Sequence, residues 1–412
     1  MAIAVWLASS EAGISATNIA GLWDAKIVAN QLEIPFRFEI AQNGNQVQGF
    51  FFEGDRRIAS SSGNFANGHL KLEYDYLETT LEVAFLGDQF FGTYRLNRPG
   101  AQPLQIRARR FAPIQANATD APQISGSWEM RRIPQEVRSP SDRQTWNLFL
   151  RQSGPEVSGS ILRVDGDTGF LLGRWQNGRL ILSHFAGQGP LLFEAKLNPD
   201  GTLAIALNRG AGYVAVRKSE ARAKGVPDPP DPSRYTSVKD PTVPFRFRFP
   251  GLDGKIVSNT DPQFKAKVVL LSIGGSWCPN CQDEAPFLVD LYREFHPQGL
   301  EIVGLMFEED ADPALARPRV QTFIKRFGIP YPMLLAGTPD DINQKIPQLV
   351  NFGAYPTSIF LGRDGRVRSV HAGFASQATG QEYVRLKGEV RSLVQRLLAE
   401  NSQTGGLASG GL

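Results

Sequence analysis

The sequence has 412 residues, of which 42% are hydrophobic and 21% charged, which is enough to bury the cores of roughly two or three globular domains. Its 44 basic and 41 acidic residues leave a net charge of +3, which gives no basis for nucleic-acid binding. No apolar run approaches the length of a transmembrane helix, and two cysteines are too few for a disulfide scaffold.

Residues 1–16 resemble the apolar core and the small-residue end of an export signal. The likeness is incomplete, because no basic residues precede the apolar run and that run is only about seven residues long. Two interpretations therefore stay open for this segment. It is either an export-signal remnant, with the start codon placed too late, or a frayed terminus.

Short alternating runs, broken by Gly, Asn and Asp, fill the chain from about Gly21 to Arg217. Alternation of apolar and polar residues between turn signals about ten residues apart is typical of antiparallel β structure. We therefore predict that this half of the chain is all β. The clearest runs are 36–40, 69–74, 80–85 and 179–182.

The β half also repeats itself. Gly21-Leu22-Trp23-Asp24 resembles Gly126-Ser127-Trp128-Glu129, and segments 42–49 and 67–72 match 152–159 and 177–182 at one common offset. These matches predict two tandem β units, at residues 17–115 and 120–217.

Each Gly-x-Trp opening resembles that of lipocalin-like and related small β-barrels, in which a tryptophan near the start of the first strand plugs one end. β-Sandwiches produce the same alternation, so the units are barrel-like or sandwich-like. They serve either as ligand-binding barrels or, in the interpretation that we favour, as a folded spacer or docking module. Nothing in them suggests catalysis.

Residues 218–243 are interpreted as a linker, since the prolines from Pro227 to Pro232 oppose a continued helix or central strand and favour an extended spacer. Strands and helices then alternate over residues 244–400, which indicates an α/β domain. The Gly- and Ser-rich residues 401–412 are predicted to be a disordered tail. The expected strands are 245–249, 252–257, 268–273, 300–307, 331–335, 357–361 and 367–370, and the expected helices are 279–296, 313–327, 340–350 and 381–399.

The only two cysteines, Cys278 and Cys281, stand where the strand 268–273 turns into the helix that begins at Pro279. A thiol at a helix N-terminus has a lowered pKa, in a range of roughly 3.5 to 7.5, because the unpaired N–H groups and the helix dipole favour the thiolate. We therefore predict that Cys278 is the attacking sulfur. Cys281, one helical turn further on, is placed to break the mixed disulfide that forms on Cys278.

Glu284 follows Cys281 by three residues and lies on the same helical face. It either exchanges a proton with the second sulfur or is an ordinary first-turn glutamate that stabilises the dipole. We also expect Trp277 to cover the pair on one side. The acidic cluster Glu308-Glu309-Asp310 ends a predicted strand and is usually a solvated turn, although carboxylates near the cysteines would tune the thiol pKa.

Three other interpretations of the cysteine pair carry less weight. A purely structural disulfide that closes a loop of about four residues removes little chain entropy. A zinc site needs two further ligands, and the four histidines are scattered singly, so we expect no bound metal. An inert pair remains as the third.

The motif Trp277-Cys278-Pro279-Asn280-Cys281, with Glu284, Pro286 and the later Ala354-Tyr355-Pro356-Thr357, resembles the extracytoplasmic thioredoxin-like thiol-disulfide oxidoreductases of the TlpA/ResA type. The resemblance covers roughly residues 240–400. It implies a thioredoxin-like fold, a cis proline at Pro356 that faces the cysteines, and a substrate groove formed by Trp277, Pro279, Asn280, Tyr355 and Pro356. It also implies a redox-active disulfide in place of a cofactor, and it favours Glu284 as the proton carrier because Ser272 stands where thioredoxins have a buried aspartate.

The resemblance further implies a periplasmic or otherwise extracytoplasmic location, a disulfide- or thiol-bearing protein substrate, and an upstream thiol protein that donates electrons. We favour a reductase of disulfides on exported proteins that works through Cys278 and Cys281. Two alternatives stay open. One is a peroxiredoxin-like peroxidase, which the second, nearby cysteine does not suit; the other is a non-catalytic interaction protein built on a thioredoxin-like scaffold.

Overall fold

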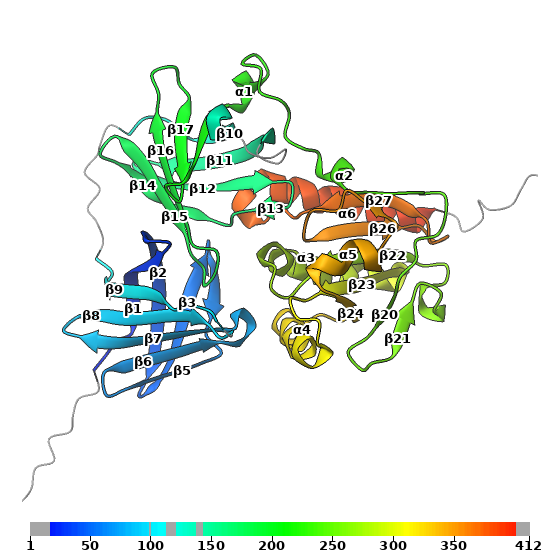
Figure 1. The fold of residues 1–412 in the computed structure, drawn as a ribbon, viewed down its shortest axis with the longest axis horizontal. Helices are drawn as coiled ribbons and strands as arrows, with labels where there is room; N and C mark the ends of the chain where they lie inside the picture. The colour runs from blue at the N-terminus through cyan, green and yellow to red at the C-terminus, as the bar shows by residue number, and fades with distance from the viewer. Residues whose placement is uncertain (1–16, 99, 113–120, 137–142, 401–412) are drawn as a thin grey trace, which may run out of the picture. The chain divides into compact units, whose positions relative to one another are not determined.

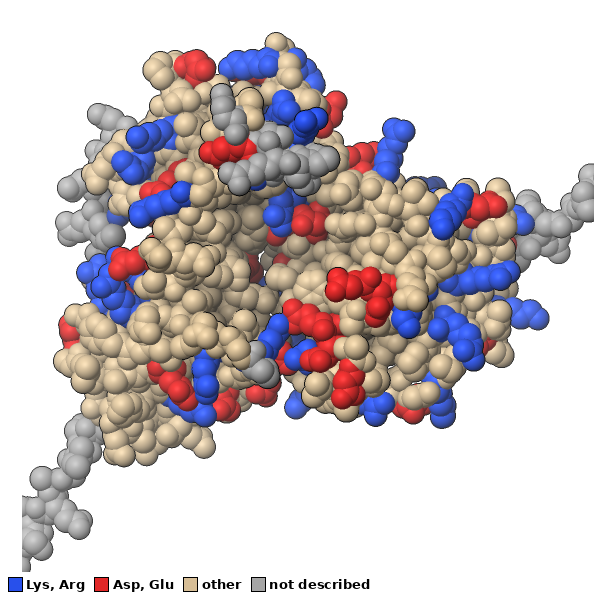
Figure 2. All heavy atoms as spheres, viewed as in Figure 1, with Lys and Arg blue, Asp and Glu red and all other residues tan. Residues whose placement is uncertain are grey.

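The computed structural model describes residues 17–98, 100–112, 121–136 and 143–400 (Figure 1). The predicted export-signal remnant and the predicted C-terminal tail therefore lie outside the described residues. The chain divides into two compact units, Met1–Phe52 with Arg56–Pro113, and Glu53–Asp55 with Ile114–Leu412. None of the helices in the described ranges has the length and apolar character needed to cross a membrane. Acidic and basic side chains are interspersed over the visible face (Figure 2).

The first β region is a closed antiparallel barrel. Its nine strands are β1 (Gly21–Ala29), β2 (Leu32–Asn43), β3 (Gln46–Glu53), β4 (Arg56–Ala59), β5 (Ser62–Ala66), β6 (His69–Tyr74), β7 (Thr79–Leu86), β8 (Gln89–Leu96) and β9 (Leu104–Arg110). Pairing of β2 with both β1 and β3 closes a ring of eight strands, and β4 extends the sheet beyond it. A short 3₁₀ helix, η1 (Asp75–Leu77), precedes β7.

The second β region has the same topology. Its nine strands are β10 (Gly126–Arg132), β11 (Trp146–Ser153), β12 (Glu156–Arg163), β13 (Gly166–Asp167), β14 (Leu171–Gln176), β15 (Arg179–His184), β16 (Leu191–Leu197), β17 (Leu203–Leu207) and β18 (Ala211–Arg217). Pairing of β11 with both β10 and β12 closes the ring, and the short β13 lies outside it against β12. The prediction of two all-β units is confirmed, and closure of both sheets identifies them as barrels.

One end of each barrel is organised around its opening tryptophan. The indole N–H of Trp23 donates to the carbonyl of Ile19, and that of Trp128 donates to the carbonyl of Ile124. Both indoles are fully buried, so a hydrogen-bond partner for the N–H is needed. The guanidinium of the last strand's final arginine lies over each ring, Arg110 at 4.6 Å and Arg217 at 4.0 Å from the ring centroid. The Gly-x-Trp part of the sequence repeat is thus a repeat of this arrangement of tryptophan, arginine and upstream carbonyl, which we call the plug.

The predicted linker holds more local structure than an extended spacer. It contains the short helices α1 (Lys218–Ala221) and α2 (Pro232–Tyr235), and the strand β19 (Ser237–Val238), which pairs with β25 (Leu349–Val350). Helix α2 begins at a proline because the first turn of a helix requires no backbone N–H there. The Asp231 carboxylate caps this helix by accepting from the backbone N–H of Ser233.

The C-terminal domain contains a five-stranded mixed sheet with helices on both faces. Its sheet has the order β24-β23-β22-β26-β27, with β22, β23 and β24 parallel and the last two strands antiparallel. The elements are β20 (Arg248–Pro250), β21 (Ile256–Ser258), η4 (Pro262–Phe264), β22 (Val268–Gly274), α3 (Pro279–Phe295), η5 (His296–Gln298), β23 (Leu300–Phe307), α4 (Pro313–Phe327), β24 (Met333–Gly337), η6 (Pro339–Asp341), α5 (Ile342–Lys345), β26 (Thr357–Leu361), β27 (Val367–Ala372), η7 (Gln377–Thr379) and α6 (Gln381–Ala399).

The expected helix over 340–350 is shorter in the structure. It consists of η6 and α5, and it ends at Lys345 because Ile346 precedes Pro347, a position that disfavours helical backbone. The hairpin expected around Asp253-Gly254 is formed by β20 and β21.

Strand β22 is buried on both faces and so fixes the two layers of the domain. Val268 and Leu270 join the core under α3, α4 and α6, whereas Val269, Leu271 and Ile273 join the core on the other face. Because side chains alternate along a strand, Ser272 points to the same side as Leu270, toward α3.

Candidate active site

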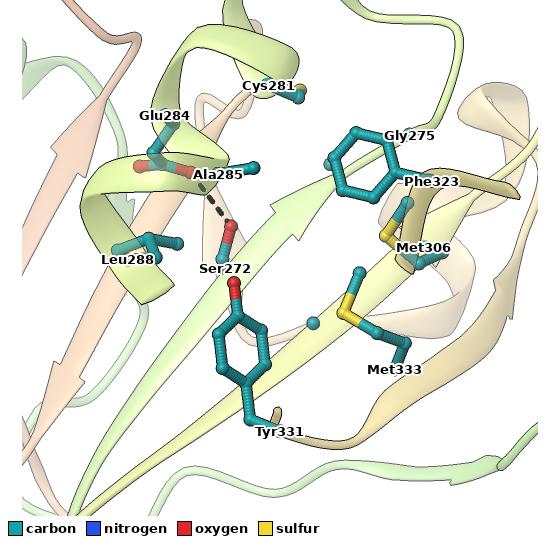
Figure 3. Close-up of a pocket in the computed structure, with 12 residues that line it drawn as sticks. Ser272, Gly275, Cys281, Glu284, Ala285, Leu288, Met306, Phe323, Tyr331 and Met333 are labelled. Carbon is teal, nitrogen blue, oxygen red and sulfur yellow. Dashed lines mark hydrogen bonds between the residues drawn. The ribbon is translucent and has the colours of Figure 1, made fainter. Parts of the chain in front are cut away.

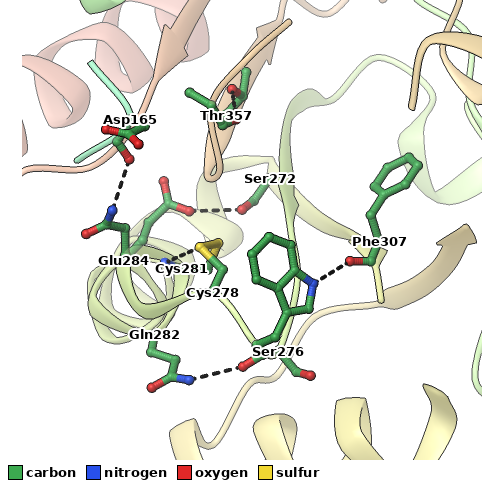
Figure 4. The surroundings of a disulfide bond; sticks show 12 residues. Asp165, Ser272, Ser276, Cys278, Cys281, Gln282, Glu284, Phe307 and Thr357 are labelled. Carbon is green, nitrogen blue, oxygen red and sulfur yellow. Dashed lines mark hydrogen bonds between the residues drawn. A yellow bond between two sulfur atoms is a disulfide. The ribbon is translucent and has the colours of Figure 1, made fainter. Parts of the chain in front are cut away.

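The turn from β22 into α3 places the two cysteines at the start of a 17-residue helix (Figure 4). Cys278 is the N-cap residue, and its sulfur accepts from the backbone N–H of Cys281 at 3.2 Å. The two residues form a disulfide with their Cα atoms 5.2 Å apart. The expected position of Cys278 at the helix start is therefore confirmed. The N-terminal N–H groups of α3 lie where they stabilise a thiolate after the disulfide opens.

Glu284 lies inside the domain, with its side chain directed at the sheet. One carboxyl oxygen accepts from the Ser272 hydroxyl at 2.9 Å, and the other accepts from the Ser358 hydroxyl at 3.0 Å. The two serines are direct cross-strand neighbours on β22 and β26 and project toward α3 together. Burial raises the pKa of Glu284 to about 7, against the lowering effect of the two hydroxyl donors. Glu284 is thus a buried carboxyl group and not a surface residue of the first helical turn.

A small cavity behind Cys281 connects the second cysteine with this carboxyl group (Figure 3). Its volume is about 20 Å³, and one ordered water needs about 10 to 15 Å³. Cys281, Glu284, Ser272 and Tyr331 contribute to its wall, and the Tyr331 hydroxyl points toward Ser272. The cavity is otherwise lined mainly by apolar residues, and it brings the Glu284 side chain and Cys281 to one shared space that is large enough for a single water molecule.

Glu308 corrects the expectation of a solvated turn after strand 300–307. Its side chain is 1% exposed and accepts from both the backbone N–H and the hydroxyl of Ser276, at 2.8 and 2.6 Å. Burial raises the pKa of this carboxyl group above its ordinary value. The carbonyl of Ser276 in turn accepts from the side-chain amide of Gln282. The loop that leads into Cys278 is therefore held at both its amide and its carbonyl.

Of the expected groove residues, Trp277, Pro279 and Asn280 adjoin the cysteines in the chain, and Tyr355 packs against Trp277. The Trp277 indole N–H donates to the carbonyl of Phe307 at 2.8 Å. Its ring packs edge-on against the ring of Tyr355, with the two ring centroids 5.4 Å apart. The Tyr355–Pro356 peptide bond is cis, as the resemblance implied. Pro279 is exposed, whereas Asn280 is half-buried and donates from its side chain to the carbonyl of Asp165 in the second barrel.

Sequence reasoning missed the roles of Ser358 and Ser276, and it considered Glu308 only as one of three acidic residues that are either solvated or near the cysteines. Ser358 is the second residue of the apolar strand β26. This position would have indicated its role if the antiparallel pairing of that strand with β22 had been known. Across the described ranges, no group of three or more His, Cys, Asp or Glu side chains is arranged to hold a metal ion.

Comparison with known proteins gives the fold and site a family context. Residues 238–384 match the redoxin family. This matched region, which we call the redoxin domain after its similarity, carries both cysteines, Glu284 and the cis proline, so the predicted resemblance to thioredoxin-like proteins is confirmed for this part of the chain.

Two curated relatives are thiol-disulfide oxidoreductases named ResA. The one from Bacillus anthracis is 33% identical over 116 residues, which are 28% of this chain and 60% of the relative. The one from Bacillus subtilis is 27% identical over 134 residues, which are 32% of this chain and 68% of the relative. The chain thus spans about 60% of the length of the first of these relatives.

Solved structures with similarity include a thiol:disulfide interchange protein of the thioredoxin family from Chlorobium tepidum. It is 26% identical, with a TM-score of 0.30, and the match covers 39% of this chain and 99% of that one. The matched regions of both ResA proteins, at 28% and 32% of this chain, are far shorter than the chain itself.

Proposed function

We propose that the protein is a thiol-disulfide oxidoreductase that works through the Cys278–Cys281 couple. The observation that carries the proposal is the disulfide at the N-cap of α3 with a buried carboxyl group behind its second sulfur. A merely structural bridge needs neither the helix terminus nor a carboxyl group that titrates near neutral pH. The similarity to relatives named thiol-disulfide oxidoreductases supports the same activity.

In the reducing direction, the Cys278 thiolate attacks one sulfur of a substrate disulfide. A Cys278–substrate bond forms, the substrate disulfide breaks, and the other substrate sulfur leaves as a thiolate and takes up a proton. The Cys281 thiolate then attacks Cys278, which re-forms the internal disulfide and releases the second substrate thiol. Glu284 accepts the proton of Cys281 before that attack, a role for which a pKa of about 7 suits it near neutral pH.

We further propose that the substrate is a disulfide-bearing protein in an extracytoplasmic compartment, and that a second thiol protein restores the reduced couple. The resemblance of the redoxin domain to extracytoplasmic oxidoreductases supports both points. Cell fractionation of the tagged chain tests the location: recovery of the full chain in the cytoplasmic fraction alone contradicts it.

Single substitutions of the two cysteines test the activity. Cys278→Ser is expected to abolish reduction of insulin by the dithiothreitol-recycled protein. Cys281→Ser is expected to abolish turnover but to accumulate a mixed disulfide on Cys278, which mass spectrometry detects. Insulin reduction by Cys278→Ser at the parent rate overturns the proposal. Peroxide consumption by the reduced protein without any protein disulfide favours the peroxidase alternative.

A further inference from the structure

The β12–β13 hairpin of the second barrel lies directly beside the cysteine pair. The carbonyl of Asp165, in its turn, accepts from the side-chain amide of Asn280, the residue between Pro279 and Cys281, at 3.1 Å (Figure 4). A second turn of the same barrel also reaches α3, where Gln188 donates to the side-chain carbonyl of Gln282 at 3.4 Å. Both contacts lie within the second compact unit.

The hairpin lies so close to the redoxin domain that two glycines at the contact have no room for a side chain. A Cβ atom added to Gly166 would lie 2.3 Å from the Asn280 amide nitrogen, and one added to Gly373 would lie 2.3 Å from the carbonyl oxygen of Val164. Gly373 is itself tied to the cis proline, because its N–H donates to the carbonyl of Pro356 at 2.6 Å. The hairpin therefore occupies the space between Asn280 and the segment that adjoins Pro356.

Buried contacts hold the hairpin in this place. Asp167, which is 6% exposed, accepts from the backbone N–H of Ser376 at 2.5 Å and from its hydroxyl at 3.0 Å. Val164 packs with Ala354 and Ala372 of the redoxin domain and is not part of the barrel core. Arg151 adds a peripheral contact, since its guanidinium donates to the carbonyl of Ala378 at 3.4 Å.

The reactive cysteine beside this hairpin is nearly buried. Cys278 is only 3% exposed, and of the residues that flank it, Pro279 is exposed and Trp277 half-buried. We propose that the β12–β13 hairpin is a wall of the substrate site that selects partners by size, so that Cys278 exchanges with a cysteine on a small thiol or a flexible, extended segment in preference to one on a folded surface. This inference rests on the proposed function and specifies its substrate class.

The rate of reduction of the internal disulfide measures the selection. The sulfur of a donor thiolate forms a bond to Cys278, the Cys278–Cys281 bond breaks, and Cys281 leaves as a thiolate that takes up a proton; the donor's second thiolate then displaces Cys278 and completes a two-electron transfer. Three dithiol donors of increasing bulk serve as probes: dithiothreitol, an unstructured peptide with two cysteines, and a folded reduced thioredoxin.

The test compares the parent with a graded pair of variants, Val164→Ala and Val164→Ala/Arg151→Ala, which weaken the contacts that hold the hairpin against the redoxin domain and substitute no residue of that domain. Arg209→Ala/Val214→Ala is the matched control, since both residues are exposed on the same barrel, Arg209 in the turn between β17 and β18 and Val214 on β18. We expect Val164→Ala/Arg151→Ala to accelerate reduction by thioredoxin at least fivefold. The rates with dithiothreitol and with the peptide should change less than twofold. The control is expected to match the parent with all three donors.

Equal acceleration with every donor, or no change with thioredoxin in a variant whose hairpin amides exchange hydrogen faster, overturns the inference. Slower reduction by thioredoxin also overturns it, because that result makes the hairpin a docking surface for folded partners. These failures are distinct from failure of the proposed function, in which none of the three donors opens the disulfide at a useful rate in any variant. Far-ultraviolet circular dichroism of each variant verifies that the two barrels and the redoxin domain remain folded.

Discussion

Glu284 shows how two hydroxyl groups and burial set the behaviour of one carboxyl group. Ser272 and Ser358 donate to its two oxygens, which favours the charged form, but the loss of water has the larger effect and raises the pKa to about 7. A glutamate with an ordinary pKa would remain ionised through the whole neutral range. At this position, by contrast, the same side chain is able both to accept and to return a proton near pH 7.

The raised pKa of Glu284 has a consequence for stability. The folded pKa of about 7 lies above the ordinary value of 4.5, so the unfolded chain loses this proton first as the pH rises. The free energy of unfolding should therefore fall by about 3 kcal/mol between roughly pH 4.5 and pH 7 on account of this one group. The contribution is fully present below that range and absent above it.

Glu284→Gln should remove this pH-dependent fall, because glutamine does not titrate. Urea unfolding of the oxidised protein at a series of pH values from 4 to 8.5 measures it, with Glu389→Gln at an exposed site of α6 as the matched loss of one carboxyl group. A parent-minus-variant difference that is the same at every pH would contradict the assignment.

At the scale of elements, the loop between β22 and α3 is held in place by a residue that follows β23, a strand later in the sequence. Glu308, just beyond β23, holds the amide and hydroxyl of Ser276, while Gln282 of α3 holds the Ser276 carbonyl. Strands β22 and β23 are parallel neighbours, so the end of one strand lies beside the loop that follows the other. The position of Cys278 thus depends on an acidic side chain outside the motif.

Glu308→Ala should destabilise the protein by about 1–3 kcal/mol, because it leaves the buried N–H and hydroxyl of Ser276 without their acceptor. Glu308→Gln, which keeps one acceptor oxygen, should lose less. Urea unfolding at pH 7 measures both changes, and Glu309→Ala, at the exposed neighbouring position, is the control. If both the alanine and the glutamine variant prove as stable as the parent, Glu308 does not hold the loop.

The sequence predicted most elements of the redoxin domain because their signals are local. Helices α4 and α6 and strand β26 have the expected bounds, and the Asp253-Gly254 turn joins the expected hairpin. The partners of Glu284 and Ser276 were beyond reach, since they depend on which strands become neighbours. The acidic run 308–310 looked solvated for the same reason: composition does not reveal that a strand end faces a loop in need of an acceptor.

At the scale of the whole molecule, the two barrels share one construction but differ in their setting. Each carries the plug of tryptophan, arginine and upstream carbonyl. The second barrel belongs to the same compact unit as the redoxin domain and contacts it through Val164, Asp165 and Asp167. The Gly-x-Trp repeat in the sequence predicted the shared plug. It gave no sign of these contacts, because they arise from the turn and β13 of the hairpin, which follow the repeated segment 152–159.

Equivalent substitutions in the two plugs should therefore have different consequences for the redox site. Replacing a fully buried tryptophan by alanine costs about 3–5 kcal/mol through lost contacts and the cavity that it leaves. Trp128→Ala should lower the stability of the second barrel and loosen the hairpin beside Asn280, so that reduction of the disulfide by a folded thioredoxin becomes faster. Trp23→Ala removes the same plug from the first barrel, in the other compact unit, and should leave that rate at the parent value.

Thermal unfolding followed by circular dichroism, together with the thioredoxin reduction rate well below the first transition, separates the two effects. A Trp128→Ala protein that is destabilised as expected but reduced no faster than Trp23→Ala would show that the hairpin keeps its contacts with the redoxin domain even when the second barrel is destabilised. Coupling between plug and site would then be absent, and the wall would have to be held by Asp167 and its partners on Ser376 alone.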